Sequence, residues 1–229
     1  MNSRSGLAAW CVIFASCFSV LFLAGCGRGE PDTGTKIPST EEGPSTVPSP
    51  SREPITEERT FYDFETDLDG WEVPIWAEGK NDYVAREVMI SPDVASSGAH
   101  SMRTVVDFPG NMWSAGLVEI QQYLNLSSYR VISGDIYIPG DVPLGLKAKF
   151  ILTVGNNWKW VEMSRSVPLI PGEWVTLTAS IEPGSYDWKR VVPDEKFAED
   201  VRKIALRIES NRKPRYSGPV YIDNIRVGK

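Results

Sequence analysis

Cysteine and histidine are nearly absent from this chain, and both absences limit its chemistry. Its 229 residues include three cysteines and one histidine. Cys11 and Cys17 lie in an N-terminal apolar run, so the rest of the chain keeps only Cys26. We therefore expect no disulfide in the folded part, whose stability must come from packing or from a metal. His100 stands beside Ser101 but lacks the sequence context of a catalytic triad.

An excess of positive charge is also absent. The chain has 24 Lys and Arg against 30 Asp and Glu, a net charge of −6. Removal of residues 1–25, whose one charged residue is Arg4, changes −6 by −1 to −7. An acidic chain without a basic cluster is a poor partner for nucleic acid, so we expect none.

Motifs of the common enzyme classes are missing as well. The sequence has no HExxH, no paired CxxC, no nucleophile elbow and no phosphate-binding loop. Hydrolysis of a glycosidic bond by a pair of carboxylates stays an open alternative, because acidic residues are plentiful. We favour a non-catalytic protein.

The N-terminus has the pattern of an export signal. Arg4 precedes an uncharged apolar run from Gly6 to Gly25. This arrangement is typical of a secretory signal, although the run is also nearly long enough to span a bilayer. The tetrapeptide LAGC at residues 23–26 resembles the bacterial lipobox, in which cleavage precedes the cysteine and that cysteine carries lipid. We predict a signal peptide at residues 1–25 and lipidation of Cys26.

The segment after this signal has the composition of a tether. Residues 26–58 are rich in Pro, Ser, Thr and Glu and have few large apolar side chains, so they cannot offset the entropy of ordering. A lipid on Cys26 attaches a protein to a membrane without spanning it. We expect an extracytoplasmic protein of the bacterial cell envelope, at the cell surface or outer membrane, and Gly27 after the cysteine fits outer-membrane delivery.

The rest of the chain, residues 59–229, is predicted to form one β-rich domain. Apolar and polar residues alternate over 115–126, 133–140, 146–154, 172–181, 203–210 and 219–227, and Pro-Gly pairs separate several of these runs. One short helix is predicted from Asp194 to about Lys203, with Phe197 and Val201 on one face. The fold class is all-β: an antiparallel β-sandwich of jelly-roll type. We expect a monomer.

Three segments carry a family resemblance: FYDFETDLDGWEV (61–73), SSGAHSMRTVVDFPGNMW (96–113) and YSGPVYIDNIRV (216–227). Together they resemble carbohydrate-binding modules of the galactose-binding-like jelly-roll superfamily. The middle of the chain, WSAGLVEIQQYLNLSSYRVISGDIYIPGD (113–141), and the segment GNNWKW (155–160) are similar to the mannan-binding modules of bacterial β-mannanases. The similarity extends over residues 61–227.

The resemblance implies a binding site for a β-linked polysaccharide, most of all β-mannan or glucomannan. The matching ligand-stacking positions are Trp76, Trp113 and Trp158, where an indole ring would cover the apolar face of a sugar. Each could instead be a packing residue. Trp160 would share the face of Trp158 in a continued strand, where it extends the platform or covers the edge of the core.

Polar groups must accompany these rings, because a sugar is chosen by its hydroxyl geometry. Glu119, Gln121 and Lys149 are candidate hydroxyl partners, since they alternate with the apolar residues of their strands; each could also be solvated surface. We expect Trp71 and Trp174 to pack under the sandwich and leave Trp188 undecided.

The same resemblance implies a structural calcium ion. The matching ligands are Glu65, Asp223 and the backbone carbonyl of His100, and calcium prefers such oxygen donors. The carboxylates of Glu65 and Asp223 could equally be ordinary solvated groups. Two other functions also stay open: a protein-interaction module of the cell envelope built on this fold, and a polysaccharide-degrading enzyme.

Overall fold

The structure is a computed structural model that describes residues 54–189 and 196–229. The predicted signal peptide, Cys26, most of the predicted tether and the start of the predicted helix lie outside these residues. The chain divides into two units, residues 1–51 and 52–229. The described residues contain no helix with the length and apolarity that a bilayer crossing requires.

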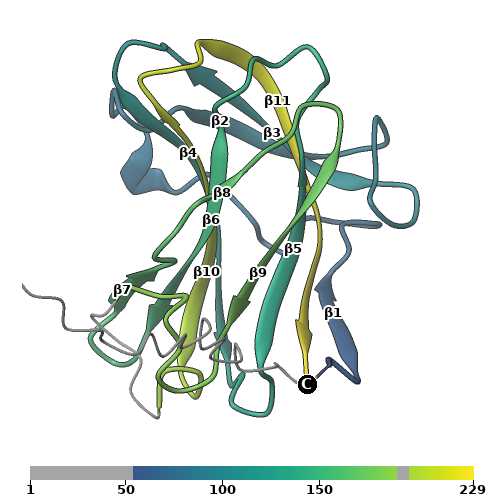
Figure 1. Cartoon of the computed structure of the whole chain (residues 1–229), viewed down its shortest axis with the longest axis vertical. Helices are drawn as coiled ribbons and strands as arrows, with labels where there is room; N and C mark the ends of the chain where they lie inside the picture. The colour runs from purple at the N-terminus through teal and green to yellow at the C-terminus, as the bar shows by residue number, and fades with distance from the viewer. Residues whose placement is uncertain (1–53, 190–195) are drawn as a thin grey trace, which may run out of the picture. The chain divides into compact units, whose positions relative to one another are not determined.

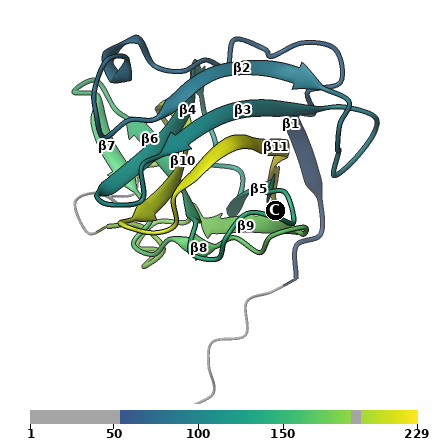
Figure 2. The same cartoon turned by 90° about the horizontal axis from the view of Figure 1, so that it is seen from above.

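The second unit is an antiparallel two-sheet β-sandwich, as the sequence predicted (Figures 1 and 2). One sheet has six strands in the order β2-β3-β11-β5-β9, with β1 paired to β11. The other has five in the order β4-β10-β6-β7, with β8 paired to β6. The strands are β1 (Glu58–Tyr62), β2 (Ala85–Ser91), β3 (Ser101–Phe108), β4 (Trp113–Leu124), β5 (Val131–Tyr137), β6 (Lys147–Val154), β7 (Lys159–Glu162), β8 (Val167–Pro168), β9 (Trp174–Ser180), β10 (Val201–Asn211) and β11 (Tyr216–Gly228).

Alternation along the strands places the core between the sheets. Phe150 and Leu206 point inward from the five-stranded sheet, and Ile136 and Ile222 from the six-stranded sheet; all four are fully buried. Strand β1 pairs with the last residues of β11 and therefore lies beside the C-terminus (Figure 1). It covers the core at that edge.

The predicted helix is wrong over the residues that the structure describes. Residues 196–199 form a turn, and β10 begins at Val201. The pairing of β10 shifts between Val201 and Lys203, as a β-bulge does. Phe197 and Val201, which the prediction placed on one face of a helix, are both buried, but Phe197 belongs to the turn and Val201 is the first residue of β10. The helical element that the described residues contain is a single 3₁₀ turn, Ile75–Ala77.

The structure places three of the remaining tryptophans. Trp71 is buried in the core, as expected, and Trp188 is buried with its indole N–H donating to the carbonyl oxygen of Ser180 at 2.6 Å. Trp174, in contrast, does not lie under the sandwich. It alternates with Val175 and Leu177 and packs at a tilt against Tyr137 on the outer face of the six-stranded sheet, where it is half-buried.

Candidate functional site

The outer face of the five-stranded sheet collects most of the predicted binding residues. Residues directly opposite one another in an antiparallel pair share a face. Successive rows across this face therefore read Leu117–Arg207–Lys149, then Glu119–Ala205–Ile151–Glu162, then Gln121–Lys203–Thr153–Trp160. Glu119, Gln121, Lys149 and Trp160 thus lie on one side of the sheet, although they come from three separate strands.

The segment before β2 covers part of this face. Residues 72 and 83 form isolated bridges to Glu119 and Ala115 at the free edge of β4. Tyr83 then packs against a small apolar cluster of Leu117, Ile151 and Ala205, which is separate from the main core. The sheet is consequently buried on both sides near its centre, with the cover supplied by aromatic side chains.

A continuous row of four aromatic rings follows from this packing. Trp113 meets Tyr83 with ring centroids 6.3 Å apart, Tyr83 meets Trp76 at 5.0 Å, and Trp76 meets Trp160 at 6.1 Å. Each contact is edge-to-face, a preferred geometry for aromatic pairs. We call these four residues the aromatic row.

The aromatic row is partly open to solvent. Trp76 and Trp160 each keep 39% of their surface exposed, while Trp113 is half-buried. Cations hold two of the rings in place: the ammonium of Lys80 lies 4.6 Å from the Trp76 ring centroid, and the guanidinium of Arg207 lies 5.6 Å from that of Trp113. These contacts restrict the rings of Trp76 and Trp113, while part of each indole stays open to solvent.

Trp158 lies apart from the aromatic row. Gly155–Trp158 form a turn closed by a hydrogen bond from the Trp158 N–H to the Gly155 carbonyl, and the Trp158 backbone has a φ of 53°. A tryptophan in this left-handed region is strained, a condition common at functional sites. Its ring is 41% exposed and meets Tyr123 at 6.3 Å.

The rings of Trp160 and Trp158 are therefore not in contact, so the two do not form the shared platform that a continued strand would give. Strand β7 begins only at Lys159, so the two tryptophans are not alternate residues of one strand. Trp160 joins the aromatic row through Trp76, whereas Trp158 pairs with Tyr123 under the guanidinium of Arg202.

A network of charged side chains lies beneath the rings. Glu162 forms ion pairs with Arg207 (2.5 Å), Lys149 (3.9 Å) and Lys189. Burial raises the pKa of Glu162, but these cations outweigh it and the net pKa lies below the ordinary value. Burial also lowers the pKa of Lys149, against the raising influence of Glu209 and Glu162. The network fixes these groups before a ligand arrives.

The three predicted hydroxyl partners differ in accessibility. Gln121 is exposed and can reach a ligand directly. Glu119 is buried, and its carboxylate accepts a hydrogen bond from Lys203 at 2.5 Å. Lys149 is also buried and donates to the Met163 carbonyl at 3.3 Å, so it supports the face from below.

The residues predicted to bind calcium meet at one turn. The Glu65 carboxylate accepts hydrogen bonds from the backbone N–H groups of Ala99 and His100. Gly98 makes this approach possible, because its φ is +64° and a Cβ there would lie 2.1 Å from a Glu65 oxygen. Glu65 thus ties the segment after β1 to the turn before β3.

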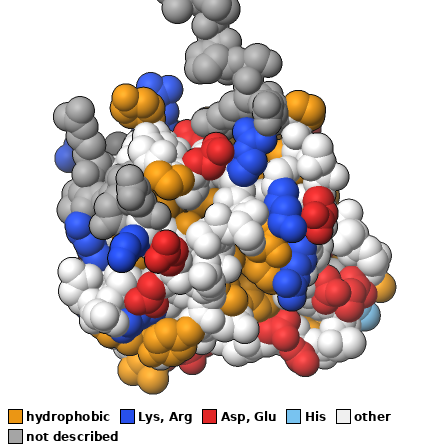
Figure 3. Space-filling model, turned by 90° about the horizontal axis from the view of Figure 1, so that it is seen from below, with side chains coloured by type: hydrophobic (Ala, Val, Ile, Leu, Met, Phe, Trp, Pro, Cys, Tyr) orange, Lys and Arg blue, Asp and Glu red, His pale blue; other side chains and the backbone are white. Residues whose placement is uncertain are grey.

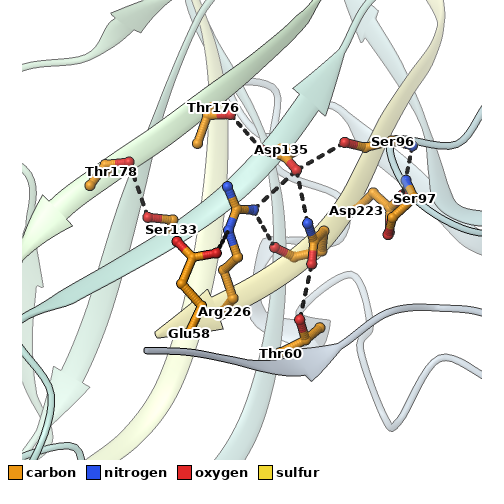
Figure 4. Close-up of polar contacts among 11 residues, drawn as sticks. Glu58, Thr60, Ser96, Ser97, Ser133, Asp135, Thr176, Thr178, Asp223 and Arg226 are labelled. Atoms are coloured by element: carbon orange, nitrogen blue, oxygen red, sulfur yellow. Dashed lines mark hydrogen bonds and ion pairs between the residues drawn. The ribbon is translucent and has the colours of Figure 1, made fainter. Parts of the chain in front are cut away.

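Asp223 reaches the same turn from β11 (Figure 4). One of its carboxylate oxygens accepts hydrogen bonds from the backbone N–H groups of Ser96 and Ser97, while Oδ1 is buried without a hydrogen-bond partner. Burial raises the pKa of Asp223. No cluster of three or more His, Cys, Asp or Glu side chains that could hold a metal ion occurs among the described residues.

His100 and Ser101 do not form a nucleophile and base. The His100 ring lies 3.4 Å from Glu65, whereas the Ser101 hydroxyl is buried and donates to the carbonyl of Val94 at 2.6 Å. On the face that Figure 3 draws, Lys and Arg side chains are interspersed with Asp and Glu.

Solved structures of carbohydrate-binding modules share this fold. The CBM27-1 module of Caldicellulosiruptor saccharolyticus, solved in complex with mannohexaose, has a TM-score of 0.52 and 18% identity, and the match covers 75% of this chain and 97% of that module. CBM28, a module specific for non-crystalline cellulose, has a TM-score of 0.54 and 14% identity, covering 76% of this chain and 96% of that module. A search of curated protein sequences found no match.

The two-sheet sandwich is thus a fold that this chain shares with these two modules. A family model described as mannanase, galactose-binding domain-like, matches residues 62–224. Because this match spans more than half of the chain, the protein belongs to that family.

Several residues of the outer face were not singled out from the sequence. Tyr83 joins Trp76 to Trp113, Arg207 and Glu162 organise the charges beneath, and Arg202 covers Trp158. Outward alternation along 203–210 marks Arg207 as lying on the same face as Lys203. No local signal shows that this face meets Tyr83.

Proposed function

We propose that this protein captures a β-linked polysaccharide, most of all β-mannan or glucomannan, on the outer face of its five-stranded sheet. The aromatic row carries the proposal. Its rings would stack on the C–H faces of successive sugars, each contributing roughly 1 kcal/mol beyond the burial of area. Gln121, Glu119 with Lys203, and the turn that bears Trp158 would supply polar and aromatic contacts around the chain.

The proposed role is binding without catalysis. Within the described residues, the acidic groups of this face, Glu119, Glu162 and Glu209, each have a cationic partner within 4 Å, so each carboxylate is engaged in an ion pair. Lys149 would act indirectly, by holding Glu162 in place.

Affinity electrophoresis tests this function. We expect glucomannan and galactomannan in the gel to retard the purified protein, and we expect no reducing sugar to be released from either polymer over time. A protein-interaction module would migrate unretarded, and an enzyme would release sugar. Either result would contradict the proposal.

The proposal includes attachment to the extracytoplasmic face of the bacterial envelope through lipid on Cys26. The sequence pattern at residues 23–26 supports it. In detergent phase partition, the protein from expressing cells should enter the detergent phase and Cys26→Ala should stay in the aqueous phase. Equal partition of the two would refute lipidation.

A structural calcium ion at Glu65, Asp223 and the His100 carbonyl is also proposed. The buried, unpartnered Oδ1 of Asp223 supports it, since a hard cation satisfies such an oxygen. The bound ion would join the segment after β1, the turn before β3 and strand β11, and so stabilise the fold.

We expect chelation to lower the unfolding temperature. A ligand that binds only the folded state at about 100 times its Kd stabilises it by about 2.7 kcal/mol, which corresponds to several degrees. Thermal unfolding with calcium, with chelator and with magnesium as control measures the effect. An unchanged midpoint on chelation would count against the ion.

A further inference from the structure

A hollow opens at the Trp113 end of the outer face. Its volume is about 480 Å³, and its lining comes from the start of β4, the region before and at the start of β6, the end of β10 and the loop between β7 and β8. The lining residues are Trp113, Gly145, Lys147, Arg165, Ser166, Glu209 and Asn211. Since Trp113 belongs to the aromatic row, the hollow continues the proposed sugar-binding surface.

The charges around this hollow are not balanced. Both carboxylate oxygens of Glu209 are engaged, one by the Ser166 hydroxyl and the other by Arg207 at 3.2 Å. Lys147 lies directly opposite Glu209 in the β6–β10 register. Even so, neither Lys147 nor Arg165 has an ion pair or hydrogen bond through its side chain to any residue that the structure describes.

These two cations differ from most of the cations on this face. Lys149, Lys189, Lys203, Arg202 and Arg207 all have carboxylate partners there. The chain as a whole carries a net charge of −6, so a local surplus of positive charge is not a consequence of composition. A concave site with such a surplus attracts an anion.

We propose that this hollow receives the carboxylate of an acidic sugar unit carried by the bound polysaccharide. This inference rests on the proposed function. A sugar stacked on Trp113 would direct its carboxylate toward Arg165 and Lys147, and a guanidinium pairs with a carboxylate through two parallel hydrogen bonds. Asn211, which is exposed, offers its amide to a neighbouring hydroxyl.

A pair of polymers with one backbone isolates the carboxylate. Glucomannan is compared with glucomannan whose primary hydroxyls have been partly oxidised to carboxylates, by titration at low salt. We expect the protein to bind the oxidised polymer about three- to ten-fold more tightly, as charge-assisted hydrogen bonds at a half-open site allow. Raising the salt concentration should reduce this preference. General electrostatics would favour the neutral polymer, because the protein is itself acidic.

Variants then assign the preference to the hollow. The double variant Lys147→Gln/Arg165→Gln should bind both polymers equally and keep its affinity for the neutral one. The matched control Arg86→Gln/Lys229→Gln also removes one arginine and one lysine, but from β2 and from the residue after β11. Both of these cations have carboxylate partners. The control should keep the preference for the oxidised polymer.

The outcomes separate this inference from the function on which it rests. Equal binding of both polymers by the unmodified protein, or an unchanged preference in Lys147→Gln/Arg165→Gln, would overturn the inference and leave glucomannan binding in place. Failure to bind either polymer would overturn both.

Discussion

Replacing Trp76 with alanine is expected to weaken mannohexaose binding by about 2 kcal/mol, or roughly 30-fold. Trp76 contacts both Tyr83 and Trp160 and so lies in the interior of the aromatic row. Its loss removes a stacking surface and divides the row. Titration calorimetry with mannohexaose measures the change. An affinity within two-fold of the unmodified protein would show that the row does not hold the sugar.

Two variants make this result specific. Trp174→Ala removes an indole from the opposite sheet, where the ring packs against Tyr137, and should leave binding unchanged. Trp158→Ala should have an intermediate effect of about 1 kcal/mol, or roughly five-fold, because Trp158 pairs with Tyr123 outside the row. All three proteins must unfold cooperatively for the comparison to hold. A larger loss from Trp158→Ala than from Trp76→Ala would move the centre of the site to the 155–158 turn.

The strands could be predicted because their signal is local. Each run of alternating residues reports which side chains point to the core, and Phe150 and Leu206 are buried as that rule requires. The bulge at the start of β10 is not visible in this way. It depends on how β10 pairs with β4 and β6 at once. The four-residue spacing of Phe197 and Val201 instead predicts one face of a helix.

The candidate site was only partly predictable, because it depends on contacts between distant segments. Trp76 and Trp160 stand in polar surroundings and so could be recognised singly. That they meet at 6.1 Å follows from the bridges that hold residues 72 and 83 against β4. Lys149 was predicted to contact sugar hydroxyls because its side chain points outward from the sheet. It is buried instead, because the segment that contains residues 72 and 83 covers this part of the outer face.

Arg226 supports a buried polar cluster on the other sheet, and its loss should have the largest effect on stability. Asp135 is buried and accepts hydrogen bonds from Arg226 (3.0 Å), the Thr176 hydroxyl (2.6 Å) and the Ser96 hydroxyl (2.9 Å) (Figure 4). Arg226 is the cation that balances the negative charge of Asp135 in this cluster. Arg226→Met leaves the carboxylate charged and without its counter-ion, at an expected cost of about 3 kcal/mol in the free energy of unfolding.

The double variant Asp135→Asn/Arg226→Met separates the charge from the packing. A neutral amide needs no counter-ion, so most of the lost stability should return. Urea denaturation measures each step, with Arg86→Met as the control. Arg86 pairs with Asp107 at 4.0 Å where both side chains are more than half exposed, so its loss should cost at most about 0.5 kcal/mol. If the double variant were no more stable than Arg226→Met, the stability at this position would come from the packing of the arginine side chain and not from its charge.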